Sequence, residues 1–224
     1  MSHRPEIIVF DVNETLLSLS SLRPGFAEVF GTADLIGEWF ARMLHGSVVS
    51  NELGDYRSFG TIGIEALLML AHKHGVDLSR GRAEGVVAGM RRLEPHPDVI
   101  PALEALSDAG VRTATLTNGS AEAATAQLDH AGITPLLDTQ MTVDEVRKFK
   151  PAREVYEAAA SRFGVDVSEM LMVAAHDWDI AGASAAGCPT AFVTRPGVSW
   201  SLPHSPPGLV VEDLTELVGA LRDG

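Results

Sequence analysis

The hydrophobic residues change their spacing along the chain, and these changes predict which segments are strands and which are helices. Residues Ile7–Phe10 form a short apolar, β-branched run that ends at a polar loop, which is typical of a buried strand. From about Leu19 to Leu93, apolar residues recur at helical spacing, and glycines end three of the four segments. We predict about four helices and no strand there. Their sequences are SSLRPGFAEVFG, ADLIGEWFARMLHG, FGTIGIEALLMLAHKHG and SRGRAEGVVAGMRRL.

The two prolines of EPHPDV end the helical block, and strands then alternate with helices. This alternation predicts an α/β protein with a parallel, doubly wound sheet. Its Rossmann-like core would comprise residues 1–18 and 94–224, with the helical residues 19–93 inserted. The predicted strands are VRTATLTNG, Thr139–Thr142, EMLMVAAH and PTAFVTR. The predicted helices are Asp98–Ala109, Ser120–Ala131, Ala152–Phe163, Ile180–Gly187 and a helix that ends the tail VVEDLTELVGALRDG.

Polar residues follow several of the predicted strands. Asp11 comes directly after the first strand, Thr117 with Asn118 ends a later one, a loop leads to Lys150, and Ala174–Asp179 follows another. Ligands bind beyond the carboxyl ends of the strands in such sheets, so we expect a site here. An aspartate after a strand is usually a turn or capping residue. The other three segments are what favour a role for Asp11 as a nucleophile.

Composition narrows the possible partners. The chain has 224 residues, of which 46% are hydrophobic, so it can bury a core. Its net charge of −13 argues against a protein that coats nucleic acid or anionic membranes. The single cysteine, Cys188, excludes an internal disulfide and fits a reducing compartment. No signal peptide or apolar run of membrane-spanning length is visible, so we expect a cytoplasmic protein.

The four polar segments resemble, in this order, the motifs of the haloacid dehalogenase superfamily. Asp11 with Thr15 matches the first motif, Thr117-Asn118 the second, Lys150-Pro151 the third and AHDWD the fourth. The resemblance covers essentially the whole chain. It implies a Rossmann-like core, a helical cap formed by residues 19–93, and a nucleophilic role for Asp11.

Most members of this superfamily are magnesium phosphatases, and two positions depart from their pattern. Asn13 stands where they keep a general acid, and an amide cannot donate and take back a proton near neutral pH. Ala175 stands where a typical phosphatase places a metal-binding acid. We therefore expect no metal and no other cofactor.

Other features resemble the 2-haloacid dehalogenase branch. Arg42 lies behind Trp39 in a cap helix, at the spacing from Asp11 where that branch keeps its halide-binding arginine. The alternative for Arg42 is an exposed helix arginine. The segments KFKPAREVY and TAFVTRPGVSW are also similar to the branch. Its best-known members have an aromatic residue at the position of Asn13 and an asparagine at that of His176.

The resemblance implies a catalytic role for several residues. Lys150 would keep Asp11 ionised, and the Thr15 hydroxyl would either hold the Asp11 carboxylate or brace the turn. Asp179 is a candidate base for the hydrolytic water. His176 is a second candidate, and it would alternatively donate a hydrogen bond to the halide.

Further residues would contact the substrate. Arg42 and Asn118 would bind the halide, and Thr117 with neighbouring backbone N–H groups would bind the carboxylate. The aromatic candidates would either line the pocket or pack in the core. The expected pocket residues are Arg42, Thr117, Asn118, Asn13, Tyr156, Trp178 and Phe59.

We thus predict a metal-independent hydrolase of short 2-haloacids. Asp11 would displace the halide from C2, and water would hydrolyse the aspartyl ester. The reaction would invert C2 and convert an L-2-haloacid to a D-2-hydroxyacid. The alternatives are cleavage of another bond, such as C–F or a strained C–N ring, a magnesium phosphatase, and a binding protein without catalysis. A homodimer is possible, because relatives usually form one.

Overall fold

A parallel β-sheet forms the centre of the protein. The computed structural model describes residues 4–203 and 206–223. Within these residues, the sheet has six strands in the order β5-β4-β1-β6-β7-β8, and every neighbouring pair is parallel. The central strands are buried on both faces, which explains their nearly continuous apolar sequences. The strands are β1 Ile7–Phe10, β4 Thr113–Thr117, β5 Thr139–Thr142, β6 Met170–Ala174, β7 Thr190–Val193 and β8 Leu209–Val211.

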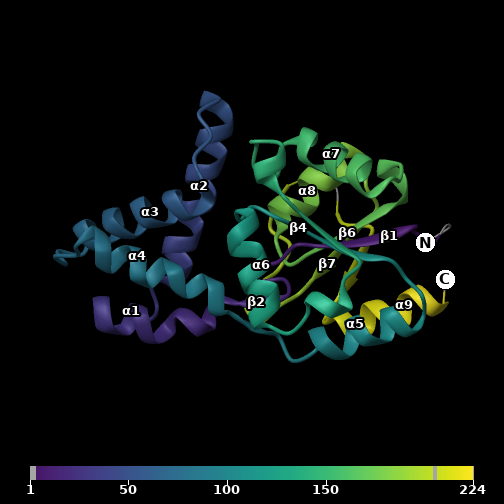
Figure 1. Ribbon diagram of the computed structural model, residues 1–224, viewed down its shortest axis with the longest axis horizontal. Helices are drawn as coiled ribbons and strands as arrows, with labels where there is room; N and C mark the ends of the chain where they lie inside the picture. The colour runs from purple at the N-terminus through teal and green to yellow at the C-terminus, as the bar shows by residue number, and fades with distance from the viewer. Residues whose placement is uncertain (1–3, 204–205, 224) are drawn as a thin grey trace.

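Helices cover both faces of this sheet (Figure 1). Helices α7 and α8 pack together on one face, and α5 packs with α9 on the other. The predicted α/β fold with a doubly wound parallel sheet is therefore confirmed. The helices of the core are α5 Val99–Asp108, α6 Ala121–His130, α7 Arg153–Phe163, α8 Asp177–Ala186 and α9 Leu214–Asp223. None of the helices in the described ranges combines the length and the apolar character needed to cross a bilayer.

A block of helices lies beside the core, between β1 and β4 in sequence (Figure 1). Its centre is Trp39, whose indole N–H donates to the Gly63 carbonyl at 2.9 Å. Met43 packs against the same glycine, where a Cβ would lie 2.8 Å from Met43 Cε. The α-helices are α1 Arg23–Phe30, α2 Ile36–Leu53, α3 Phe59–Lys73 and α4 Arg80–Ala88, flanked by the 3₁₀ turns Leu19–Leu22 and Gly89–Arg92.

Helix α2 is longer than the sequence suggested. We predicted that Gly46 ends it, but the helix continues to Leu53. Gly46 is instead a packing position, since a Cβ there would lie 2.7 Å from Ile62 of α3. The added turns bring Asn51 to the core, where its amide donates to the Phe149 carbonyl and accepts from the Phe149 N–H, each at 2.8 Å.

Short strands escaped the sequence analysis. The strands β2 (Leu17–Ser18) and β3 (Glu94–Pro95) pair antiparallel, Leu17 opposite Pro95 and Ser18 opposite Glu94. Both connections between the core and the helical block therefore run side by side. The domain limits that we placed at residues 18 and 94 lie in this pair, and the division into two domains stays a prediction.

Candidate active site

The loop after β1 holds Asp11 and Thr15 against each other. The N–H groups of Leu16 and Leu17 both donate to the Val12 carbonyl at 2.9 Å, and Glu14 adopts a left-handed backbone with φ 61°. This tight turn lets the Thr15 hydroxyl donate to Asp11 Oδ2 at 2.7 Å. The same hydroxyl accepts from the Ala175 N–H at 2.9 Å. Thr15 therefore both holds the carboxylate and braces the loop, so the alternatives for it were not exclusive.

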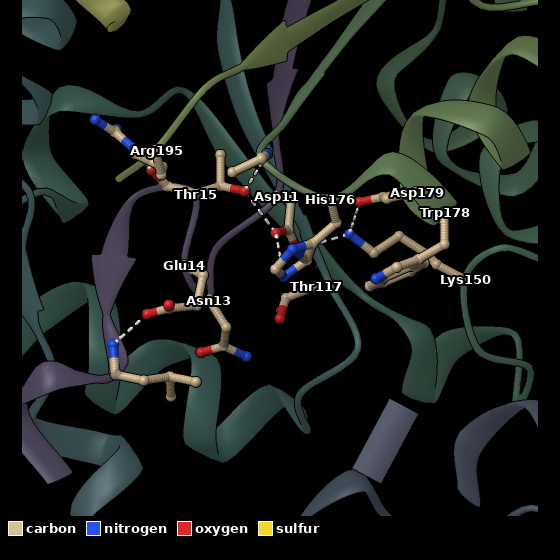
Figure 2. A network of polar contacts seen from close by, with 12 residues as sticks. Asp11, Asn13, Glu14, Thr15, Thr117, Lys150, His176, Trp178, Asp179 and Arg195 are labelled. Carbon is tan, nitrogen blue, oxygen red and sulfur yellow. Dashed lines mark hydrogen bonds and ion pairs between the residues drawn. The ribbon is translucent and has the colours of Figure 1, made fainter. Parts of the chain in front are cut away.

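Lys150 lies between two carboxylates in the interior of the protein (Figure 2). Its ammonium donates to Asp11 Oδ1 at 2.8 Å, to Asp179 Oδ2 at 2.7 Å and to the Leu116 carbonyl at 2.8 Å. All three donors of the ammonium are thus used, which offsets the cost of burying its charge. The Lys150 N–H donates to Asn118 Oδ1 at 2.9 Å, so the second and third predicted motifs are also joined.

The electrostatics of this cluster keep Asp11 charged. Burial raises the pKa of Asp11, but Lys150, His176 and Thr15 outweigh it and hold this pKa below its usual value. For Lys150, burial lowers the pKa, and the two carboxylates more than reverse this and raise it. Burial raises the pKa of Asp179, with Lys150 acting in the opposite direction. Asp11 is therefore an ionised, oriented carboxylate at the end of β1.

Asp179 has both carboxylate oxygens engaged. Lys150 occupies Oδ2, and the Tyr156 hydroxyl donates to Oδ1 at 2.6 Å. The Asp179 residue has no exposed surface. Helix α8 begins at Asp177, three residues before the predicted start at Ile180, so Asp179 lies in its first turn. Burial raises the pKa of Tyr156 well above its usual value, which keeps the hydroxyl protonated as a donor.

His176 faces the outer oxygen of Asp11. It precedes α8 as its N-cap residue, and its ring stacks on Trp178 with centroids 5.2 Å apart. The ring of Phe40, from α2, also lies near it, with centroids 5.6 Å apart. His176 Nε2 is 3.9 Å from Asp11 Oδ2, is buried and has no hydrogen-bond partner among the described residues. Figure 2 shows the ring beside the Asp11 carboxylate.

Three further residues that we predicted for the site, Thr117, Asn118 and Asn13, differ in their hydrogen-bond partners. The Thr117 hydroxyl accepts from the Gly119 N–H at 3.1 Å. Asn118 Nδ2 is buried and has no partner in the described part of the chain, so it is available to a ligand. Asn13 Oδ1 accepts from Gln127 Nε2 at 2.9 Å, which fixes the orientation of the amide.

Among the described residues, the side-chain partner of Arg42 is Glu38 and not a member of this cluster, and its role in halide binding stays a prediction. Its guanidinium pairs with Glu38 at 3.2 Å, and its side chain is 39% exposed. Lys73 of α3 also pairs with Glu38, at 2.8 Å. Phe40 is the residue of α2 that faces His176, and positions two apart on a helix point to nearly opposite sides. The side chain of α2 that lies beside His176 is thus Phe40, two residues before Arg42.

Phe59, at the start of α3, lies between the two parts of the protein. Its ring is 6.4 Å from Phe40 and 6.0 Å from Phe149. It also lines a cleft of about 520 Å³, to which the core contributes Asn13 and Gly119. The cleft therefore lies where the helical block meets the loops that follow β1 and β4.

Two charged residues near the site, the buried Arg195 and the half-buried Glu14, were missed by the sequence analysis. Arg195 donates to the Thr15 carbonyl from Nε at 3.1 Å and from Nη2 at 2.7 Å, and its Nη1 donates to Asp98 at 2.7 Å. Glu14 accepts from the Leu19 N–H, and burial raises the pKa of Glu14. Arg195 follows β7, so its place at a strand end was the one available signal.

The described residues contain no group of three or more His, Cys, Asp or Glu side chains arranged to hold a metal ion. The Lys150 ammonium lies between the carboxylates of Asp11 and Asp179 and forms an ion pair with each. Ala175 is buried beside them and offers no ligand atom.

The parallel core, the inserted helices and a buried Asp–Lys–Asp cluster at the strand ends define a hydrolase with a haloacid dehalogenase-like fold. A family model for haloacid dehalogenase-like hydrolases matches residues 5–187. The chain belongs to this family, and within it to the 2-haloacid dehalogenase branch. It is an enzyme.

Similar proteins cover nearly the whole chain. (S)-2-haloacid dehalogenase 1 of Pseudomonas sp. (strain CBS-3) is 30% identical over 93% of this chain and 93% of its own length. (S)-2-haloacid dehalogenase 4A of Burkholderia cepacia is 28% identical over 93% and 91%. The structure of L-2-haloacid dehalogenase from Xanthobacter autotrophicus with chloropropionic acid covalently bound has a TM-score of 0.91. It is 25% identical and covers 97% of this chain and 98% of that one.

Proposed function

We propose that this enzyme hydrolyses short 2-haloacids to 2-hydroxyacids through an ester on Asp11. The observation that carries the proposal is the ionised Asp11 carboxylate, held by Lys150 and Thr15 at the end of β1. A carboxylate fixed in this way is a nucleophile toward a carbon that bears a good leaving group. The haloacid dehalogenation named for the relatives supports this choice of substrate.

The first step is displacement of the halide from C2. An Asp11 oxygen forms a bond to C2, the carbon–halogen bond breaks, and the electron pair leaves with the halide. The departing halide needs no proton, so the amide of Asn13 is no obstacle. The buried, unpartnered Asn118 Nδ2 is the donor that we assign to the halide.

The substrate carboxylate needs donors of its own. We assign it to Thr117 and the backbone N–H groups of the loop that follows, at the start of α6. Phe40, Phe59 and Trp178 provide apolar surface near His176 for the alkyl part of the substrate.

Metal independence is part of the proposal. Lys150 supplies the positive charge between Asp11 and Asp179 that a divalent cation would otherwise provide. Ester formation inverts C2, and cleavage of the ester at the Asp11 carbonyl leaves C2 unchanged. An L-2-haloacid therefore gives a D-2-hydroxyacid. The (S) and L designations of the relatives support this preference.

We also propose that the enzyme is a cytoplasmic homodimer. Its single cysteine, Cys188, is buried and unpaired, as suits a reducing compartment. Helix α2 exposes Val48 and Leu53, which are 49% and 74% accessible and would be covered in a dimer. The molar mass in solution, measured by light scattering, tests the oligomeric state.

The function is tested by halide release from L- and D-2-chloropropionate with and without EDTA, with p-nitrophenyl phosphate as a control substrate. We expect release from the L isomer that EDTA leaves unchanged and that Asp11→Asn abolishes. Phosphate release that EDTA removes, without halide release, would contradict the proposal.

A further inference from the structure

Hydrolysis of the Asp11 ester needs a group that takes a proton from water. The residues around Asp11 offer two such groups, Asp179 and His176. We propose that His176, and not Asp179, is the base of this second step. The inference rests on the proposed ester mechanism and goes beyond it by assigning the base.

Asp179 is committed to other partners. Lys150 and Tyr156 occupy its two carboxylate oxygens at 2.7 and 2.6 Å. Its exposed fraction is zero, and the Lys150 ammonium lies between it and Asp11. A water that attacked Asp11 would have to displace one of these hydrogen bonds before Asp179 could accept its proton. Asp179 is thus a positioning residue that holds Lys150.

His176 has the opposite properties. Its Nε2 is buried but has no partner among the described residues, and it faces Asp11 Oδ2 from 3.9 Å. This distance exceeds that of a hydrogen bond. A water at about 2.8 Å from Nε2 can also reach the Asp11 carbonyl carbon at about 3 Å, the separation of a near-attack geometry. Phe40 and Trp178 hold the ring in this position.

His176 flanks the nucleophile, where the ester forms, because its Nε2 lies 3.9 Å from Asp11 Oδ2. A donor to the halide would act in the first step and a base acts in the second. The two roles therefore differ in which step a substitution of His176 slows.

The proton balance of the step is simple. The oxygen of the water bonds to the Asp11 carbonyl carbon, and the water proton passes to His176 Nε2. The bond between that carbon and the ester oxygen then breaks, and His176 returns the proton to the departing 2-hydroxyacid oxygen. Asp11 releases the remaining proton to solvent, which its lowered pKa favours. Lys150, beside Asp11 Oδ1, stabilises the negative charge that develops on the carbonyl oxygen.

The test is a single-turnover experiment with L-2-chloropropionate and His176→Asn. We expect a burst of one chloride per site at close to the wild-type rate, followed by turnover that is about 10²–10⁴-fold slower, the usual contribution of a general base. Intact-protein mass spectrometry should show the ester on the enzyme. The matched control is His72→Asn, the same change at an exposed histidine of α3, which should turn over as the wild type does.

Two further variants keep the test decisive. His176→Ala with added imidazole should recover the slow phase without changing the burst. Asp179→Asn should lose the burst itself, because Lys150 loses a partner. Ester accumulation in Asp179→Asn but not in His176→Asn would overturn the assignment. A folded His176→Asn that releases no chloride would also overturn it and point to the first step. Absence of chloride release from the wild type would refute the ester mechanism as a whole.

Discussion

The buried ammonium of Lys150 leads to a prediction about stability. Lys150→Met removes the charge and keeps an unbranched side chain. It leaves the carboxylates of Asp11 and Asp179 buried, 6% and 0% exposed at their side chains, without the cation between them. Breaking a buried ion pair from one side costs about 3–5 kcal/mol. We expect the free energy of unfolding at pH 8 to fall by about this amount, and halide release to be lost.

The loss should depend on pH in a defined direction. Without Lys150, burial and mutual repulsion raise the folded-state pKa of this carboxylate pair above the unfolded value of about 3.9. The folded variant then binds more protons than the unfolded chain, so its stability rises as the pH falls toward the unfolded value. In the wild type, the lowered pKa of Asp11 has the opposite effect, and its contribution is lost as the pH falls through the folded pKa.

Urea unfolding between pH 5 and pH 9, followed by tryptophan fluorescence, measures this difference. Lys73→Met is the matched control, since Lys73 pairs with Glu38 at the surface with half of its side chain exposed. That pair should contribute no more than about 1 kcal/mol. The argument is refuted if Lys150→Met loses less than about 1 kcal/mol and the loss is the same at every pH.

Three further changes test the surroundings of the cluster. In Gly182→Ala, the new Cβ would lie 2.5 Å from Pro151 Cβ. We therefore expect the free energy of unfolding, measured by thermal unfolding, to fall by about 1–3 kcal/mol and halide release to be slower. An unchanged melting temperature would contradict this. Arg195→Gln leaves the Thr15 carbonyl without two charged donors. We expect the free energy of unfolding to fall by about 3 kcal/mol, and kcat to fall as well. A normal kcat would show that the contact between Arg195 and Thr15 is dispensable for catalysis. Arg42→Ala should change kcat/KM for L-2-chloropropionate by less than about threefold, because it removes only a surface ion pair. A large loss would show that Arg42 takes part in substrate binding or catalysis.

The parts of the site that follow strands were predictable, and the parts that depend on packing were not. Asp11 and Lys150 end up together because parallel strands place their carboxyl ends at one edge of the sheet, a property that is visible in the order of the segments. Helix α2 shows the limit of this reasoning. The count of residues along α2 does not determine which side of the helix faces the core, and Phe40 occupies that side.

Long-range contacts explain the other differences. Gly46 has the appearance of a helix end in the sequence, but Ile62 lies against it, and close packing of two helices needs a residue without a side chain. Arg195 reaches Thr15 across 180 positions of the chain, and nothing near Arg195 in the sequence indicates that contact. The strands β2 and β3 have two residues each, too few to show any periodicity.

The pairing of β2 with β3 has a consequence for how such an enzyme diversifies. Because Ser18 lies opposite Glu94, the helical segment leaves and rejoins the core at neighbouring points. A segment of another length, or a short linker, can join these points without moving β1 or Asp11. The helical segment, which carries Phe40 and Phe59, can thus be exchanged separately from the nucleophile. A graft between residues 18 and 94 is a practical way to vary that apolar surface with Asp11 left in place.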